Sequence, residues 1–347
     1  MTKLPIKTAI IGYGFSAKTF HIPFIAGLDE FELCAISTSQ KEAVEHDWPQ
    51  VTHYSTASEL LSQSDAELVI ITAPNDVHFA LAKLALENNK HVVLEKPFVT
   101  KLEDGQALIE LAAQQQRILS VYHNRRWDGD FLTAKMLITQ GQLGDVKSFE
   151  SHFDRFRPQV RERWREQTTD GGGILFDLGS HLIDQALQLF GLPQSLSAQC
   201  LKMRDNSINV DYFNIVFHYA DKQVTLHGDL YSPAPNKRFT IKGSIGSYEK
   251  LGLDPQEARL IAGVSPTVEG WGDETKDQYG LLYNERGSKA IPTQSGSYQN
   301  YFVALSDSIR KQGAIPVDPQ DALWTIKLIE LAMESSRLGK TIPIEEL

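Results

Sequence analysis

The chain has 347 residues, of which 41% are hydrophobic and 22% charged, and its formal net charge is −10. This length exceeds what one hydrophobic core usually supports, so two domains are expected. The negative charge argues against a nucleic-acid-binding surface, and no apolar run approaches the roughly 20 residues that cross a bilayer. Cys34 and Cys200 have no disulfide or metal-ligand spacing, and the first residues enter a strand without room for a signal sequence. We therefore expect a cytoplasmic globular protein with no metal site, binding neither nucleic acid nor membrane.

A dinucleotide-binding fingerprint follows the first predicted strand, Lys7 to Ile11. Gly12 permits a tight turn, Gly14 lets the backbone approach a pyrophosphate, and Ala17 permits close packing of the next helix on the sheet. The amino terminus of that helix would receive the phosphates. The residues assigned to this part of the cofactor site are Gly12, Tyr13, Gly14, Phe15, Ser16 and Ala17.

The second predicted strand, Phe31 to Ile36, indicates which dinucleotide binds. A cofactor with a free adenosine ribose usually meets Asp or Glu about 20 residues past the fingerprint. Here the strand is followed instead by Ser37, Thr38, Ser39 and, after Gln40, Lys41. Hydroxyls and an ammonium group suit a 2′-phosphate, so NADP(H) is favoured and NAD(H) is the alternative. In a second interpretation Lys41 is only a solvated residue at a helix start.

Strands and helices then alternate through Tyr122. The predicted elements are a helix over 55–61 with Ser58 as N-cap, a strand over 67–72, an amphipathic helix over 76–89, a strand over 92–94, a helix over 101–116 and a strand over 117–122. In the helix over 76–89 the apolar residues at helical spacing are Val77, Ala80, Leu81, Leu84 and Ala85. This β-α series predicts a doubly wound parallel sheet, that is, a Rossmann domain over residues 1–122.

Lys96 is the candidate catalytic residue of this domain. Pro97 removes a ladder donor and ends the preceding strand, so Lys96 should lie at the carboxyl tip of that strand, on the rim where open α/β sheets bind ligands. Shielding there can lower the pKa of a lysine enough for proton exchange near neutral pH. The alternative is a solvated lysine that closes a strand. Asn75, which follows another strand, is expected on the same rim.

Four motifs together resemble the Gfo/Idh/MocA oxidoreductases, the relatives of glucose–fructose oxidoreductase and inositol dehydrogenase. They are GYGFSA at 12–17, TAPNDVH at 72–78, EKP at 95–97 and DLGSH at 177–181, and the resemblance spans residues 6 to about 190. It implies two domains, NAD(P)-dependent hydride transfer on sugar- or polyol-like substrates, Lys96 as the catalytic lysine and a cis Lys96–Pro97 bond. The further residues assigned to cofactor binding are Ala73, Pro74, Asn75, His78, Glu95, Lys96 and Asn124.

The second predicted domain, residues 123–347, begins with a polar and aromatic hinge at 123–128 that contains Arg126. Arginines at 155, 157, 161, 163 and 165 follow within eleven residues and could bind a carboxylate or phosphate. Trp164 could stack on a sugar ring, so Arg126, Trp164 and Arg165 are candidate substrate-binding residues. The alternative for any one arginine is a solvated or interface position.

A predicted helix from Asp170 to Phe190 contributes the acid/base group. Asp177, His181 and Asp184 fall at i, i+4 and i+7, so they share one face. A carboxylate one turn from an imidazole can orient the ring for proton transfer, which makes His181 the candidate acid/base and Asp177 its orienting group. Asp184 is interpreted as a helix partner of His181. A lone histidine on such a helix is otherwise usually structural.

Strands dominate after residue 195 and predict a large, open, mainly antiparallel sheet. Its uncovered face is expected to pair with a second copy, giving a homodimer or higher homo-oligomer. Residues 254–298 are expected to be irregular and to cover the active site, and a helix is expected over 318–338 with Met333 facing inward.

The sequence as a whole favours an NADP-preferring oxidoreductase acting on a carbohydrate-like alcohol or carbonyl. In the oxidative direction the substrate hydroxyl loses its proton to the Lys96/His181 pair while the carbon gives a hydride to the nicotinamide. Asn75 is expected beside the nicotinamide ribose, and Lys96, Asp177 and His181 are expected to touch the substrate. The alternatives are a non-catalytic dinucleotide-binding regulator and a reductase of a non-sugar carbonyl or imine.

Overall fold

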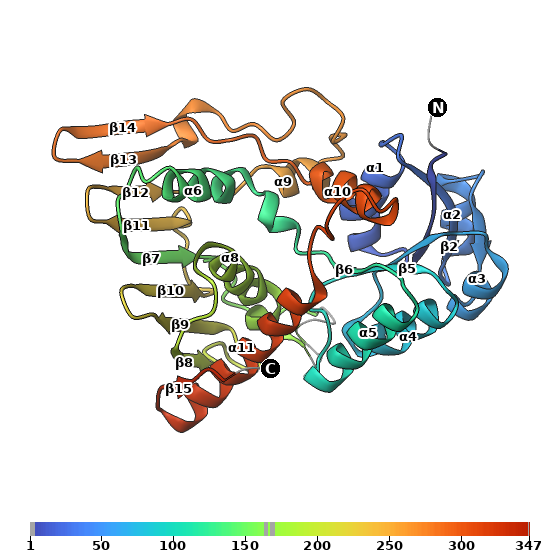
Figure 1. Cartoon of the computed structure of the whole chain (residues 1–347), viewed down its shortest axis with the longest axis horizontal. Helices are drawn as coiled ribbons and strands as arrows, with labels where there is room; N and C mark the ends of the chain where they lie inside the picture. The colour runs from blue at the N-terminus through green and yellow to red at the C-terminus, as the bar shows by residue number, and fades with distance from the viewer. Residues whose placement is uncertain (1–3, 163–165, 167–170, 346) are drawn as a thin grey trace. The chain divides into compact units, whose positions relative to one another are not determined.

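The computed structural model describes residues 4–162, 166, 171–345 and 347. The chain divides into two compact units (Figure 1). The first contains residues 1–124, 256–271 and 297–323, and the second contains 125–255, 272–296 and 324–347. The sequence predicts a single domain boundary after Tyr122. In the structure, two later segments, 256–271 and 297–323, also belong to the first unit.

A six-stranded parallel sheet forms the first unit, in the order β3-β2-β1-β4-β5-β6. Its strands are β1 (Ile6–Ile11), β2 (Phe31–Ser37), β3 (Thr52–Tyr54), β4 (Leu68–Ile71), β5 (His91–Leu94) and β6 (Leu119–Val121). The order reverses between β1 and β4, which confirms the predicted doubly wound sheet. The apolar β4 sequence LVII is fully buried, as expected of a strand covered on both faces.

Helices connect these strands. They are α1 (Ile22–Ile25), α2 (Lys41–Asp47), α3 (Ala57–Gln63), α4 (His78–Glu87) and α5 (Leu102–Gln114), and α1 follows a π-helical turn, Ala17–His21. The N-cap of α3 is Thr56, not Ser58, because Thr56 and Glu59 form a reciprocal capping box. The predicted inner face of α4 is correct only in part: Ala85 is buried and Leu81 and Leu84 are half-buried, whereas Val77 and Ala80 are exposed and the buried face also includes Ala82 and Leu86.

Later segments of the chain complete the core of the first unit. These are α9 (Gln256–Ile261) and α10 (Gln299–Ile309). Phe302 of α10 stacks on Phe24 with ring centroids 4.9 Å apart and lies 5.6 Å from the ring of Tyr122. Ser120 of β6 donates a hydrogen bond to the carbonyl of Val317 at 3.0 Å. The Rossmann sheet is therefore packed by residues that lie almost 200 positions further along the chain.

The second unit is built on a nine-stranded sheet in the order β14-β13-β12-β11-β7-β10-β9-β8-β15. The strands are β7 (Val146–His152), β8 (Ser195–Leu201), β9 (Tyr212–His218), β10 (Gln223–Gly228), β11 (Phe239–Gly243), β12 (Ser247–Lys250), β13 (Gly280–Asn284), β14 (Gly287–Ile291) and β15 (Ile342–Pro343). Within this second sheet, β7 and β10 are the one parallel pair among the described residues, and the other pairs are antiparallel. The prediction of a large, mainly antiparallel sheet is confirmed.

Three helices cover one face of this sheet: α6 (Gly129–Thr139), α8 (Ser180–Phe190) and α11 (Pro319–Leu338) (Figure 1). Alternate residues of β9 and β10, such as Phe213 and Leu226, are buried beneath them, and the residues between are half-buried. One expectation holds only in part and another is wrong. Residues 254–298 are only partly irregular, since they also form α9 and the β13–β14 hairpin. Met333 is exposed, because α11 turns Leu328 and Ile329 inward. No helix in the described ranges has the length and apolar character that a bilayer span requires.

Candidate active site

The fingerprint loop lies beside the point where the strand order reverses. It follows β1, and Thr72, which follows β4, donates from its backbone N–H to the carbonyl of Ile11 at 2.9 Å. In open parallel sheets the crevice beside such a reversal is the usual ligand site. The residues predicted from the ends of β2, β4 and β5 all follow carboxyl ends of strands in this sheet, so they share its rim.

Gly12 and Gly14 have different structural reasons to be glycine. Gly12 has φ = 98°, and a Cβ there would lie 2.7 Å from Thr72 Oγ1, so a side chain is excluded by both the turn and the neighbouring strand. A Cβ on Gly14 would meet no atom of the described chain within 4 Å. The open space at Gly14 fits the close approach of a pyrophosphate, and the fully buried Ala17 fits the predicted close packing.

Alanine substitutions should separate these two roles. Gly12→Ala should destabilise the protein by about 1–3 kcal/mol because the substituted residue is strained. Gly14→Ala should leave the melting temperature nearly unchanged and weaken dinucleotide binding at least ten-fold. Thermal unfolding and a fluorescence titration with NADPH measure both effects, and unaltered NADPH affinity in Gly14→Ala would contradict the assignment of this loop.

The other side chains of the fingerprint are divided between the interior and the surface. Tyr13 is buried and its hydroxyl donates to Asp47 at 2.7 Å; burial, followed by this hydrogen bond, raises the pKa of Tyr13. Phe15 is 61% exposed, whereas Ser16 donates to the carboxylate of Glu95. The backbone of this loop, together with Phe15, is therefore what remains available to a ligand.

The residues after β2 present hydroxyls and one ammonium group. Ser37 is buried at the strand end, Thr38 is half-buried, and Ser39 and Lys41 are exposed. Lys41 starts α2 and lies 3.6 Å from Glu45 at i+4, with 63% of its side chain exposed. Such exposed pairs contribute little free energy, so Lys41 can exchange Glu45 for an incoming anion at small cost.

The segment after β4 contains the buried His78. His78 is fully buried, and its ring nitrogens lie 3.1 Å from the carbonyl oxygen of Pro97 and 3.0 Å from that of Ala73. Burial lowers the pKa of His78, which favours the neutral ring. The ring lies between the segments that follow β4 and β5, and its contact with the cofactor stays a prediction. Pro74 is exposed, and Asn75 is 8% exposed on the same segment.

Glu95 joins the fingerprint to the segment that carries Lys96. Its carboxylate accepts hydrogen bonds from Ser16 and from Nε2 of His21, the latter at 2.9 Å. Burial alone would raise the pKa of Glu95, but these hydrogen bonds outweigh it and hold the pKa at about 2. His21 is fully buried against the ring of Tyr122, 4.4 Å away. The carboxylate of Glu95 therefore holds the fingerprint loop to the segment that carries Lys96, and its contact with the cofactor stays a prediction.

Lys96 follows β5 as predicted, and its peptide bond to Pro97 is cis, which confirms the expectation drawn from the family resemblance. Its backbone N–H donates to Glu95 Oε2 at 3.1 Å, and the residue is half-buried. Asn124, at the end of the first unit, is 7% exposed.

Asp177 and His181 belong to the second unit. A π-helical turn, Leu175–Gly179, contains Asp177 and leads directly into α8, where the sequence predicts a regular α-helix. The wider turn rotates Asp177 relative to His181, and such turns are frequent at functional sites. His181 is 4% exposed and Asp177 is half-buried.

Arg126 and Asp184 form a bidentate ion pair that the sequence did not indicate. Arg126 Nη2 lies 2.6 Å from Asp184 Oδ1, and Nε lies 2.9 Å from Oδ2. One residue further along α8, Gln185 donates to the carbonyl of Arg125 at 2.7 Å. These contacts fix α8, and hence His181, to the segment 125–126, so Arg126 holds a carboxylate of the chain itself.

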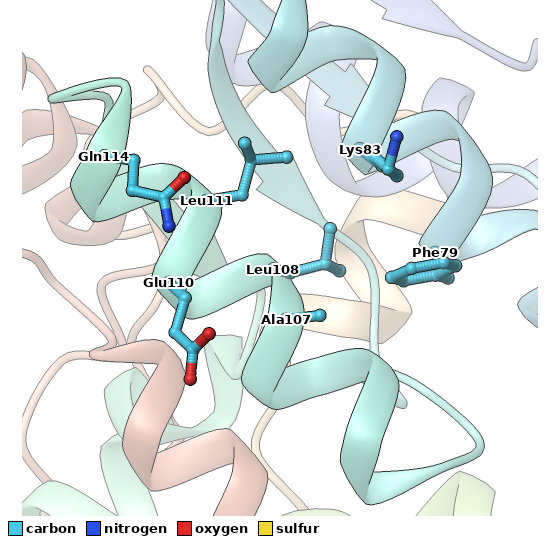
Figure 2. Close-up of a pocket in the computed structure, with 7 residues that line it drawn as sticks. All are labelled: Phe79, Lys83, Ala107, Leu108, Glu110, Leu111 and Gln114. Carbon is cyan, nitrogen blue, oxygen red and sulfur yellow. The ribbon is translucent and has the colours of Figure 1, made fainter.

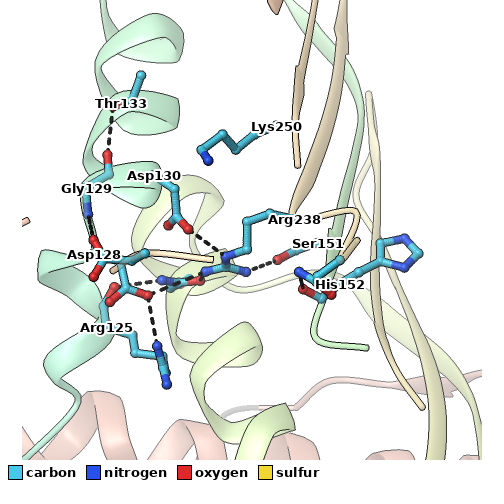
Figure 3. Close-up of polar contacts among 12 residues, drawn as sticks. Arg125, Asp128, Gly129, Asp130, Thr133, Ser151, His152, Arg238 and Lys250 are labelled. Carbon is cyan, nitrogen blue, oxygen red and sulfur yellow. Dashed lines mark hydrogen bonds and ion pairs between the residues drawn. The ribbon is translucent and has the colours of Figure 1, made fainter. Parts of the chain in front are cut away.

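A buried polar network supports α8 from the sheet side (Figure 3). Arg238 is fully buried and donates to Asp130 at 3.2 Å, to Ser151 at 2.9 Å and to Gln185 at 2.6 Å. Asp128, also buried, lies 3.4 Å from Arg125. Nothing in the sequence pattern indicates Arg238 or His21. The partners of Arg238 lie 53 to 108 positions away along the chain, and Glu95 lies 74 positions from His21.

Trp164 and Arg165 lie outside the described residues, as do Arg163 and Asp170. The backbone of the described part of that stretch is held by Arg204, which donates hydrogen bonds to the carbonyls of Arg157 and Gln159 at 3.3 and 3.1 Å. Arg204 also pairs with the buried Asp211 at 3.0 Å.

A small cavity lies between α4 and α5 (Figure 2). It is lined by Phe79, Lys83, Ala107, Leu108, Glu110, Leu111 and Gln114. None of these follows a strand end, so this cavity belongs to the helix layer and not to the cofactor rim.

Two family models cover most of the chain. A model described as "Oxidoreductase family, NAD-binding Rossmann fold" matches residues 6–123, and one described as "Oxidoreductase family, C-terminal alpha/beta domain" matches residues 135–344. Both carry the Gfo/Idh/MocA name.

Individual proteins match over nearly their full length. YdgJ of Escherichia coli, an uncharacterized oxidoreductase, is 46% identical over 97% of this chain and 98% of its own. The scyllo-inositol 2-dehydrogenase (NADP⁺) IolW of Bacillus subtilis is 40% identical over 98% of this chain and 96% of its own. A solved oxidoreductase structure from Bacillus subtilis, yvaA, superposes with a TM-score of 0.95 at 40% identity, over 99% of this chain and all of that one.

Proposed function

The chain belongs to the Gfo/Idh/MocA oxidoreductase family, and from this premise we propose that it transfers a hydride between NADP(H) and a sugar- or polyol-like substrate. The observation that carries the proposal is the joint position of Gly14 and Lys96 on one rim of the parallel sheet, beside its reversal point. The similarity to a scyllo-inositol dehydrogenase supports a cyclic polyol or a sugar as the substrate class.

Within this proposal the chain binds the cofactor and handles the proton. The nicotinamide supplies the hydride chemistry when it is bound. Lys96 hydrogen-bonds the reacting oxygen and shares with His181 the transfer of its proton, and Asp177 orients His181 or a neighbouring hydroxyl. The buried, ionised Glu95 keeps the segment bearing Lys96 attached to the fingerprint loop. Asn75 binds the nicotinamide ribose.

The preference for NADP(H) is supported by the residues after β2, where hydroxyls and Lys41 replace the usual acid. We expect Lys41→Ala to weaken NADPH binding about ten-fold or more, since a hydrogen bond between charged groups contributes about 1.5–3 kcal/mol, and to leave NADH binding unchanged. Fluorescence titrations with both nucleotides measure this. Lys83→Ala, at another exposed lysine paired with a glutamate at i+4, is the matched control. Equal loss of NADH affinity would contradict the assigned role.

Turnover tests the proposed reaction directly. The purified protein should oxidise at least one member of a panel of inositols, aldoses and polyols with NADP⁺, or reduce the corresponding ketone with NADPH, followed by nicotinamide absorbance. Tight NADPH binding without turnover on the whole panel would favour a dinucleotide-binding regulator instead. Turnover only with non-sugar carbonyls or imines would contradict the proposed substrate class and still support hydride transfer.

We also propose that two copies of the chain pair through the sheet face opposite α6 and α8, in the cytoplasm. The support is the burial pattern: Tyr212, Asn214 and Thr225 on that face are half-buried and largely polar. Light scattering should then give about twice the chain mass of 38.9 kDa, or a higher multiple.

A further inference from the structure

We propose that His152, Asp154 and His227 form a binding site for a divalent transition-metal ion, with Zn²⁺ the best-suited ion. The three residues lie in the second unit and take no part in the proposed hydride transfer. Each offers one ligand atom, and these atoms all lie within 4.8 Å of one another. The site lies on the sheet face through which we propose that two copies pair, and it is independent of the proposed hydride transfer.

Strand pairing brings the two histidines together. His152 ends β7, and His227 is its direct partner on β10, in the parallel pair of the sheet. Their ring centroids are 4.9 Å apart. Figure 3 shows Ser151 directed toward the buried Arg238 and His152 directed the other way, so the imidazoles emerge on the face opposite the Arg238 network.

The backbone around Asp154 is held on both sides. Phe153 donates to the carbonyl of His227 at 2.9 Å, and Arg155 donates to that of Asp229 at 3.0 Å. The N–H of Asp154 itself donates to the side chain of Asn236 at 2.7 Å. The carboxylate is therefore positioned between the two rings before any ligand binds, which is what a metal site of useful affinity requires.

The distances and the chemistry fit a tetrahedral ion. Asp154 Oδ2 lies 3.1 Å from His152 Nδ1, and Oδ1 lies 2.8 Å from His227 Nδ1. Ligands bound to Zn²⁺ at about 2.0–2.2 Å are separated by about 3.3 Å, so small rotations would admit the ion.

A second carboxylate can support His152. Its Nε2 is buried and makes no hydrogen bond among the described residues, and Glu150 Oε2 is 3.8 Å away. When Nδ1 binds a metal, Nε2 carries the proton and needs an acceptor, and carboxylates commonly fill this role behind zinc-bound histidines. In the single chain the side chains of His152, Asp154 and His227 keep 17%, 11% and 16% exposure, so an ion can reach them, and three protein ligands leave a fourth coordination position for another ligand.

The test uses the full chain without a histidine tag, stripped with a chelator and dialysed. Titration with Zn²⁺ against a chromophoric chelator should give one ion per chain, and Co²⁺ should give the visible bands of a tetrahedral site. His227→Gln and Asp154→Asn should abolish both signals, and Glu150→Gln should weaken Zn²⁺ binding about 10–100-fold. His218→Gln should bind as wild type, since His218 is a half-buried histidine of β9 that contacts Ser197 instead.

Two results would overturn the proposal. One is wild-type protein that binds less than one Zn²⁺ per chain at micromolar ion, a measurement that does not depend on how the variants fold. The other is Zn²⁺ binding that survives in well-folded Asp154→Asn or His227→Gln. Mg²⁺, which prefers six oxygen ligands, should not compete. Zn²⁺ should also raise the melting temperature of wild type by about 5 °C at saturation and that of His227→Gln not at all.

Discussion

Replacing Lys96 with methionine should lower kcat by about 10²–10⁴-fold, the usual contribution of a positioned acid/base group. The reason is its place after β5 on the rim that carries the dinucleotide fingerprint, half-buried and flanked by the ionised Glu95. Methionine keeps the length of the side chain and removes the ammonium group. NADPH affinity, measured by fluorescence, should change only a few-fold, since the phosphates are expected at Gly14 and Lys41.

Two companion variants define what this loss means. Lys96→Arg keeps the charge but cannot release its proton near neutral pH, so it should be nearly as inactive as methionine. Lys101→Met, at an exposed lysine five residues later, should keep wild-type kcat. If Lys96→Met retained more than a tenth of wild-type kcat on the true substrate, Lys96 would not be the catalytic lysine.

Replacing Arg238 with methionine should destabilise the second unit by about 3–5 kcal/mol, the usual result of removing one partner of a buried ion pair. Asp130 is 0% exposed and would keep a charge without its guanidinium partner, and Ser151 and Gln185 would each lose a hydrogen bond. Thermal and urea unfolding measure the loss. Because Gln185 lies one turn from His181, turnover should also fall at temperatures where the protein is still folded.

The neighbouring residue provides the control. Lys237 is half-exposed and lies 3.4 Å from Glu150, so Lys237→Met should cost less than about 1 kcal/mol. The double variant Arg238→Met with Asp130→Leu should recover part of the stability, because no buried charge is then left uncompensated. Equal, small losses for Arg238→Met and Lys237→Met would contradict the role of the network.

The first sheet could be predicted because its information is local. Each strand is a short apolar run, each helix follows within a few residues, and Gly12, Asn75 and Lys96 stand directly after strands. The N-cap of α3 was also readable, since Thr56 and Glu59 have the spacing of a capping box. The predicted N-cap, Ser58, lies two residues after the observed one.

The β13–β14 hairpin could not be read in the same way. In β14 the residues Gly287 to Ala290 are all exposed, so the apolar alternation that marks a strand is absent. The hairpin forms because its backbone continues the ladder of β12, which is a property of the folded sheet. The contact of His152 with His227 is hidden for the same reason, because strand register creates it. The contact of His21 with Glu95 joins a helical turn to the end of β5, 74 positions away, which spacing along the chain does not reveal either.

The return of α10 to the first unit has a consequence for how the protein is made on the ribosome. Phe302, Tyr301 and Val317 complete the packing around Tyr122 and Ser120, so the Rossmann sheet lacks part of its core when residue 124 is synthesised. About 200 further residues must follow, which takes about 10–40 s at about 5–20 residues per second. During that interval the nascent sheet exposes the aromatic rings of Phe24 and Tyr122, and it is then that a chaperone would be needed.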